Sequence, residues 1–290
     1  MGSKLELTSR DWKVLSGLEK WGVLGLGQLF GIAAETEAGE ERRVARFFNE
    51  TYRRDYSLWF SQRLTALVKH GYIKDNFYLN HSKAFTLAER GHKALQAQGL
   101  AVLKGFRWGI SAELLSHELN VAAVGLVLSD IHGLKVRAER ERYIWSSNGG
   151  RTPAPTRALS DLWIVDPQPK AIEVEISQKS EHRYKEIWDA YRLRLPHNSP
   201  VLYLTGWPDG VRCILYHARQ FRAPFVHACA LDAFRASCGR AAFKGILEGQ
   251  PFLLAQSGSG PAAPSLQVSG AGLLSLTRSA KVPMVPGGQI

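Results

Sequence analysis

The stretch LSDLWIVDPQPKAIEVEI, residues 159–176, decides the fold of the second half of this chain. Apolar and polar side chains alternate on both sides of the turn DPQP, a pattern that is typical of two strands joined as a β-hairpin. A turn centred on its glutamine pairs Asp161 with Glu175 and Trp163 with Glu173. The three carboxylates of this hairpin then share one face, while the other face is apolar.

The sequence around the hairpin predicts further helices and strands. Helical periodicity and buried apolar runs mark elements on both sides of it. In order, we expect a helix over 112–128, strands over 134–144, 161–165 and 171–176, a helix over 182–195 and a strand over 201–205. The predicted order is αβββαβ, and we assign residues 108–254 to one domain of the α+β or α/β class.

The acidic face of the hairpin needs compensation. Carboxylates directly across two strands repel one another, so a divalent cation, a neighbouring Lys or Arg, or open solvent must lie beside them. Lys179 follows the second strand closely enough to reach them. Glu118 lies within the apolar arc of the 112–128 helix and would add a further carboxylate, since burying it without a partner is costly. A salt bridge to Glu118 and a solvated outer face of the hairpin are the alternatives.

These elements and residues resemble the PD-(D/E)XK nuclease-like fold, which carries an Asp on its second strand and Glu-x-Lys on its third. The resemblance implies a catalytic group of Asp161, Glu173, Glu175 and Lys179, and a Mg²⁺ or Mn²⁺ cofactor bound by Asp161, Glu173 and Glu118. Glu175 stands at the lysine position of the motif, so Lys179 would supply the missing cation. Two hypotheses stay open: a metal-dependent DNA endonuclease, and an inactive nuclease-like domain that only binds.

The first hundred residues predict three helices followed by a β-hairpin. Thr8 and Asp11 form a capping box before a helix of about three turns, and a short second apolar face follows at 26–30. A charged insert over 35–54 precedes a third helix, which Asp55 would cap. Two extended runs and a closing helix follow, over 73–79, 83–87 and 88–98. This order is that of a winged helix-turn-helix.

The predicted winged helix-turn-helix domain, residues 1–107, is basic enough to bind DNA. It holds 17 Lys and Arg against 11 Asp and Glu, a net charge of +6. In helix-turn-helix proteins the recognition helix enters the major groove, while cations beside it contact phosphates. The candidate DNA-contacting residues are Arg53, Arg54, Ser61, Gln62, Arg63, Thr65 and Lys69. Solvated helix residues and a dimerisation role, which would make the chain a homodimer, are the alternatives.

Short motifs in this domain resemble those of the replication-relaxation family of mobile-element proteins. They are Leu7-Thr8 with Asp11 and Val14-Leu15, then Gln28-Leu29-Phe30, then Arg63-Leu64 with Leu67 and Gly71-Tyr72-Ile73, and finally Phe85-Thr86-Leu87 with Gly91. The resemblance covers residues 5–205 and implies a role in the replication, mobilisation or control of a plasmid, phage or conjugative element. The long charged insert departs from the compact pattern of the family.

The composition of the whole chain favours a polyanionic partner such as DNA. Its 290 residues carry a net charge of +11. Neither an uninterrupted apolar stretch of about 18 residues nor a signal-peptide core is found, so we expect a cytoplasmic protein with no membrane partner. Cys213, Cys229 and Cys238 lack zinc-site spacing and are expected to be buried thiols. Residues 255–290 are rich in Gly, Ser and Pro, which indicates a flexible tail.

Overall fold

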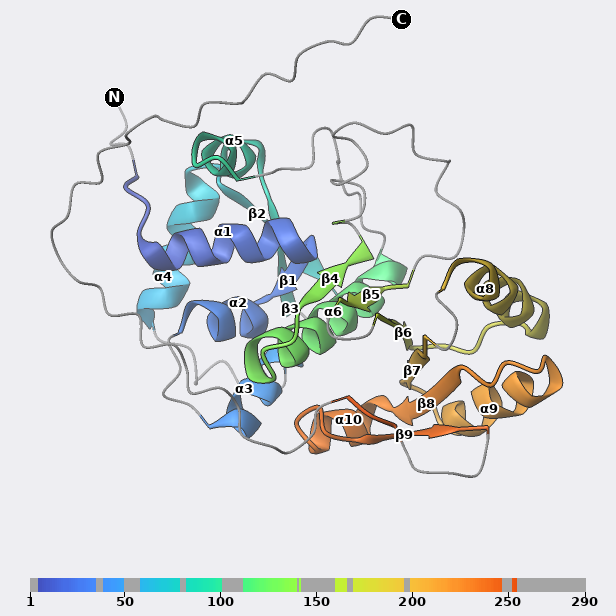
Figure 1. Cartoon of the computed structure of the whole chain (residues 1–290). Helices are drawn as coiled ribbons and strands as arrows, with labels where there is room; N and C mark the ends of the chain where they lie inside the picture. The colour runs from blue at the N-terminus through green and yellow to red at the C-terminus, as the bar shows by residue number, and fades with distance from the viewer. Residues whose placement is uncertain are drawn as a thin grey trace, which may run out of the picture. The chain divides into compact units, whose positions relative to one another are not determined.

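The computed structural model has mixed α+β architecture, which confirms the predicted class (Figure 1). It describes residues 5–34, 39–49, 58–78, 82–100, 112–139, 141, 160–165, 169–195, 199–246 and 252–254. Met1–Ser257 forms one compact unit. The predicted domain boundary near residue 107 and the predicted tail lie outside the described residues.

The N-terminal part builds a small antiparallel sheet flanked by helices. Its elements are α1 (Ser9–Trp21), β1 (Val23–Gly25), α2 (Leu26–Ala33), α3 (Glu40–Phe47), α4 (Leu58–Lys69), β2 (Ile73–Tyr78), β3 (Ser82–Leu87) and α5 (Glu89–Ala97). The strand order is β1-β3-β2, and both pairings are antiparallel. The three predicted helices, the hairpin and the closing helix are confirmed. Strand β1 was not predicted, because its residues are all buried and show no alternation.

Helix α1 begins where the capping box predicts. The Thr8 backbone N–H donates to Asp11 Oδ2 over 2.7 Å, and the Asp11 N–H donates to Thr8 Oγ1 over 3.4 Å. Val14, Leu15 and Leu18 are buried on its inner face. The polar start and the apolar stripe therefore orient α1 as the sequence indicates.

The charged insert contains a helix, α3, that the sequence analysis did not anticipate. Its buried residues are Val44 and Phe47, and the charged majority around them hides this short apolar stripe. The Arg43 guanidinium lies over the Phe47 ring at 5.9 Å and donates to the Asp130 carbonyl oxygen over 3.3 Å. Helix α3 is therefore packed into the fold by both its apolar and its basic side chains.

The C-terminal part builds a mixed sheet, with seven strands in the described ranges. Its elements are α6 (Ala112–Leu126), the π-helical continuation η3 (Val127–Ile131), β4 (Val136–Ala138), β5 (Leu162–Ile164), β6 (Lys170–Glu175), α8 (Glu181–Arg194), β7 (Val201–Thr205), α9 (Gly210–Gln220), β8 (Val226–Ala230), α10 (Leu231–Ala236), β9 (Ala242–Gly245) and β10 (Phe252–Leu253). The strand order is β10-β9-β8-β7-β6-β5-β4, in which β6, β7 and β8 are parallel and the other pairings are antiparallel.

The predicted order αβββαβ is confirmed from α6 to β7, and the elements after β7 were not predicted. Of the strand predicted over 134–144, the described residues form a strand only at Val136–Ala138, and Glu139 and Glu141 are helical; residues 140 and 142–144 lie outside the described residues.

The β5–β6 hairpin pairs two residues away from the predicted register. Trp163 lies opposite Ala171 rather than Glu173, and Leu162 lies opposite Ile172. A turn centred one residue earlier accounts for this shift. Because side chains alternate with a period of two, each one stays on the face that the sequence assigns to it. The acidic face therefore survives the change of register.

Helix α6 belongs to the core of both parts. The buried Gln28 carboxamide accepts from the Gly25 N–H over 2.9 Å and donates to the Leu119 carbonyl oxygen over 2.7 Å. A Cβ atom on Gly125 would lie 2.2 Å from the Trp21 ring, so only glycine permits this close approach of α6 to α1. The two parts therefore share one hydrophobic core.

One described helix, Leu114–Ile131, is long and apolar enough to cross a bilayer by length and composition. Half of that stretch is buried inside the protein, where α6 contacts β1, β4 and β6. Packing against three strands is reason enough for its apolar composition. The absence of a membrane partner stays a prediction.

Candidate functional site

Four titratable residues gather at one end of β5 and β6 and form what we call the carboxylate cluster: Asp161, Glu173, Glu175 and Lys179. The Val174 N–H donates to Asp161 Oδ2 over 2.7 Å, which joins Asp161 to β6. From α6, the His117 ring places Nε2 3.2 Å from Asp161 Oδ1. The charges of Asp161 and Lys179 both act on the Glu173 carboxyl group. The structure therefore brings together the four residues for which the resemblance implies a catalytic role.

Glu173 is a buried acid that keeps its proton near neutral pH. Burial raises the pKa of Glu173 to about 8, and the charge of Asp161 acts in the same direction. A hydrogen bond from Tyr191 and the charge of Lys179 oppose that rise in pKa. The Tyr191 hydroxyl donates to Glu173 Oε1. A protonated Glu173 does not repel Asp161, and this explains how two acids can face each other across the hairpin.

Glu175 is also buried, and it forms an ion pair with Lys179. The loop after β6 places this lysine, and its backbone N–H donates to the Tyr184 hydroxyl over 3.1 Å. Burial lowers the pKa of Lys179, while the charges of Glu173 and Asp161 act to raise it. Lys179 thus supplies positive charge beside the acidic face.

The remaining predicted metal ligand, Glu118, lies half-buried on α6 beside His117. Burial lowers the pKa of His117, but the hydrogen bond and charge of Asp161, helped by the charge of Glu118, raise it overall. Within the described part of the chain, no three His, Cys, Asp or Glu side chains are arranged to hold a metal ion. A cation at the cluster would have to displace Lys179 from Glu175 and the proton from Glu173.

The sequence analysis did not place His117 and Tyr191 in this site. Tyr191 shares the buried face of α8 with Tyr184 and Trp188, at helical spacing. Buried tyrosine hydroxyls usually find hydrogen-bond partners, so this face of the helix was the available signal for Tyr191. His117 gave no comparable signal, because its partner Asp161 comes from a distant part of the chain.

Helix α4 presents a polar face to solvent and buries Phe60, Leu64 and Leu67 on the other side. The exposed residues among the predicted DNA contacts are Ser61, Gln62, Thr65 and Lys69. The Thr65 hydroxyl donates to the Ser61 carbonyl oxygen over 2.9 Å, which fixes its direction. Arg53 and Arg54, together with the predicted cap Asp55, lie outside the described residues.

Arg63 differs from the other predicted contacts because it binds α1. Its Nε donates to Asp11 Oδ1 over 3.0 Å, and its Nη2 lies 2.5 Å from Asp11 Oδ2 and from the Glu6 carbonyl oxygen. Burial acts to raise the pKa of Asp11, but hydrogen bonds from Arg63 and Thr8 hold it below its usual range. Arg63 therefore fixes α4 against the capping box of α1, and its role as a base-reading residue stays a prediction.

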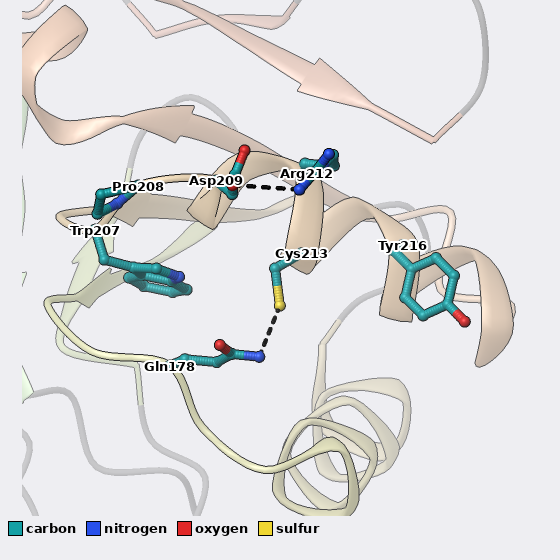
Figure 2. A pocket seen from close by; sticks show the side chains of 7 residues that line it. All are labelled: Gln178, Trp207, Pro208, Asp209, Arg212, Cys213 and Tyr216. Carbon is teal, nitrogen blue, oxygen red and sulfur yellow. Dashed lines mark hydrogen bonds and ion pairs between the residues drawn. The ribbon is translucent and has the colours of Figure 1, made fainter.

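A pocket of about 480 Å³ opens beyond the carboxyl ends of β6 and β7 (Figure 2). It is lined by Gln178, Trp207, Pro208, Asp209, Arg212, Cys213 and Tyr216. Gln178 Nε2 donates to Cys213 Sγ over 3.3 Å, and Arg212 forms an ion pair with Asp209 at 3.2 Å. Cys229 and Cys238 are buried as predicted, whereas Cys213 is only half-buried and faces this pocket.

Comparisons of the chain with protein-family models, with curated proteins and with solved structures return no match.

Proposed function

We propose that this chain is a DNA-binding protein whose N-terminal part contacts duplex DNA through the exposed face of α4. The observation that carries the proposal is the row of hydroxyl, amide and ammonium groups on that face, above a buried apolar side. Such groups hydrogen-bond base edges in the major groove and phosphates beside it.

The surroundings of α4 support this role. Helices α1 and α2 precede it, the β2–β3 hairpin follows it, and β1 completes the sheet, which is the arrangement we expect of a winged helix-turn-helix. Helix α3 is an addition to that arrangement. The pair Arg63–Asp11 holds α4 in place from behind, so the exposed face is presented in one orientation.

We further propose that the protein serves a mobile genetic element, in replication, mobilisation or transcriptional control. This proposal rests on the motifs that resemble the replication-relaxation family. One of these motif residues has a packing reason: a Cβ atom on Gly91 would lie 2.3 Å from the Tyr72 carbonyl oxygen, where α5 meets the start of β2. The motif around Gly71-Tyr72-Ile73 and Gly91 therefore has a direct role in packing. It supports the proposed biological role only through the resemblance to the family.

The DNA-binding proposal predicts that affinity for duplex DNA falls steeply with salt. Each phosphate that the protein neutralises contributes about −0.9 to the slope of log K against log salt concentration. Lys69→Gln should reduce the steepness of that slope by about 1 if Lys69 contacts a phosphate. Fluorescence anisotropy with a labelled duplex at several salt concentrations measures the slope.

Lys244→Gln is the matched control for this experiment. Lys244 is also an exposed lysine, but it lies on β9 in the C-terminal part. The two variants lose the same charge, so a change of slope in Lys69→Gln alone points to α4. Equal slopes in both variants and the wild type, or no duplex affinity at low salt, would contradict the proposal.

Metal-dependent cleavage of DNA is the second candidate function. The observation that favours it is the gathering of Asp161, Glu173 and Glu175 at one end of the sheet, with Lys179 beside them. Asp161 and Glu173 would hold Mg²⁺ or Mn²⁺, and a bound divalent cation polarises a phosphodiester and lowers the pKa of its bound water. This chain's own groups would orient the phosphate, with Lys179 opposite its negative charge.

Calorimetric titration with Mn²⁺ tests this second candidate. Wild-type protein should release heat on binding and gain thermal stability with rising Mn²⁺ concentration, and Asp161→Asn should remove both effects. If Lys179 alone compensates the cluster, wild type and variant will show no binding heat. DNA cleavage assays with Mn²⁺ then decide between an active and an inactive nuclease-like site, since a site that binds Mn²⁺ without cleaving duplex or single-stranded DNA has only a binding role.

A further inference from the structure

The pocket described above stands where parallel sheets usually bind ligands. Strands β6, β7 and β8 run parallel, and Trp207 follows β7 by two residues while Gln178 follows β6 by three. Ligands of open α/β sheets bind just outside the carboxyl ends of such strands. A volume of about 480 Å³ lies within the usual range for sites that hold a small organic group.

Two aromatic side chains give this pocket its chemical character. Figure 2 shows the Trp207 indole and the Cys213 thiol pointing into the space above Gln178, with Tyr216 farther along α9. Tyr216 is 56% exposed, which is unusual for so large an aromatic ring. Exposed aromatic faces are platforms on which unpaired bases can stack, and such stacking tolerates any base because every base has a π-face.

Arg212 adds an anion-binding group at the rim of the pocket. Both members of its ion pair with Asp209 are exposed: 81% of the Arg212 side chain and 68% of the Asp209 side chain are accessible to solvent. Exposed pairs of this kind contribute little to stability and are easily exchanged. A phosphate group can therefore replace Asp209 as the partner of Arg212 at small cost.

The pocket is joined directly to the carboxylate cluster. Gln178 lines the pocket, and the next residue, Lys179, pairs with Glu175 in the cluster. A nucleotide with its base in the pocket would thus continue its backbone toward the cluster along the same loop. Lys179 and Arg183 are cations of this loop and of the start of α8, and they form ion pairs with Glu175 and Glu186.

We propose that the pocket binds an unpaired nucleotide of a DNA strand, with the base against Trp207 and Tyr216 and a phosphate on Arg212. The proposal rests on the DNA-binding function proposed above and adds that the protein recognises DNA with a single-stranded end or gap. Gln178 offers amide groups to the edge of the base. The pocket and α4 then contact different features of the DNA, one unpaired and the other duplex.

Affinity measurements with two DNA probes test the proposal on the full chain. The probes are a blunt duplex and the same duplex with a short oligothymidine overhang, and a free oligothymidylate serves as a third ligand. Wild-type protein should bind the overhang probe more tightly than the blunt one. Trp207→Ala should lose that preference by about 5- to 100-fold, because one stacked base contributes this much to affinity.

Three further variants separate stacking from loss of structure. Trp207→Phe retains an aromatic face and should retain most of the preference. Tyr216→Ala removes an exposed side chain that contacts Gln220 and His217 of its own helix, so the fold should tolerate the change. Arg212→Gln should weaken binding of the overhang, whereas Arg137→Gln, which removes the same charge from edge strand β4, should not. Asp209→Asn releases Arg212 and should strengthen the binding.

The outcomes distinguish this inference from the proposed function. Equal affinity for both duplex probes, or a preference that Tyr216→Ala and Arg212→Gln leave unchanged, overturns the pocket proposal while duplex binding stands. Failure to bind either duplex overturns the proposed function; binding of the free oligothymidylate that is lost in Trp207→Ala and kept in Trp207→Phe would then still support the pocket.

Discussion

Replacing Arg63 by alanine is expected to destabilise the protein by about 3 kcal/mol, because the change leaves the Asp11 carboxylate buried without its ionic partner. Asp11 is only 2% exposed, and its side chain also accepts the capping hydrogen bond from Thr8. The free energy of unfolding in urea, followed by tryptophan fluorescence near neutral pH, measures the loss. In the native protein Arg63 thus fixes the position of α4, the helix proposed to contact DNA.

The double variant Asp11→Asn/Arg63→Ala is the control for this prediction. Because it removes both charges, it should be less destabilised than the sum of the two single variants.

The stabilisation by the Arg63–Asp11 pair depends on pH in a defined direction. The pKa of Asp11 is held low, so the pair is fully formed above pH of about 4 and is lost as the pH falls below that value. Unchanged stability of Arg63→Ala together with lost DNA affinity would restore Arg63 as a DNA-contacting residue.

Glu173→Gln is expected to stabilise the protein at alkaline pH, on the order of 5 kcal/mol at about pH 9. The pKa of Glu173 is about 8 in the folded protein and 4.5 in a free side chain, so the folded state holds an extra proton between these values. Wild-type stability must therefore fall as the pH rises from about 4 to about 8. A glutamine at this position can still accept a hydrogen bond from the Tyr191 hydroxyl and has no proton to lose. The stability of the variant therefore does not fall over this pH range for that reason.

Urea unfolding at about pH 5 and about pH 9 measures the difference between wild type and Glu173→Gln. The variant and the wild type should differ little at the lower pH and strongly at the higher one. Glu181→Gln is the matched control, since Glu181 is an exposed glutamate at the start of α8. A difference that is the same at both pH values would show that Glu173 is ionised throughout, with Lys179 as its partner.

Local sequence patterns predicted the helices and strands whose own residues show a capping motif or a regular spacing of apolar side chains. The capping box located α1, and alternation located β5 and β6. Helix α3 was not predicted because its two large apolar residues, Val44 and Phe47, stand among six charged or small residues, a composition typical of a solvated segment. Strand β1 was not predicted because a fully buried strand of three residues shows no alternation of apolar and polar side chains.

The candidate site was predictable to the extent that it depends on alternation. Asp161, Glu173 and Glu175 stay on one face in either register, because the true and predicted registers differ by two residues. The contacts of His117 and Tyr191 join α6 and α8 to the hairpin and depend on how helices pack over the sheet. The pocket depends on the parallel crossovers that align β6 with β7, and no local pattern near Trp207 indicates that alignment.

The bond from Gln28 to Leu119 limits how this protein can be recombined with others. An N-terminal part that ends before α6 would leave the Gln28 amide without its acceptor and would expose Val23 and Ala84, which pack with Leu115 in a small cluster. Gene fusions that exchange the N-terminal part alone would therefore start from a damaged core. Productive exchange must carry α6 along, so the exchangeable unit extends beyond the N-terminal helices and strands.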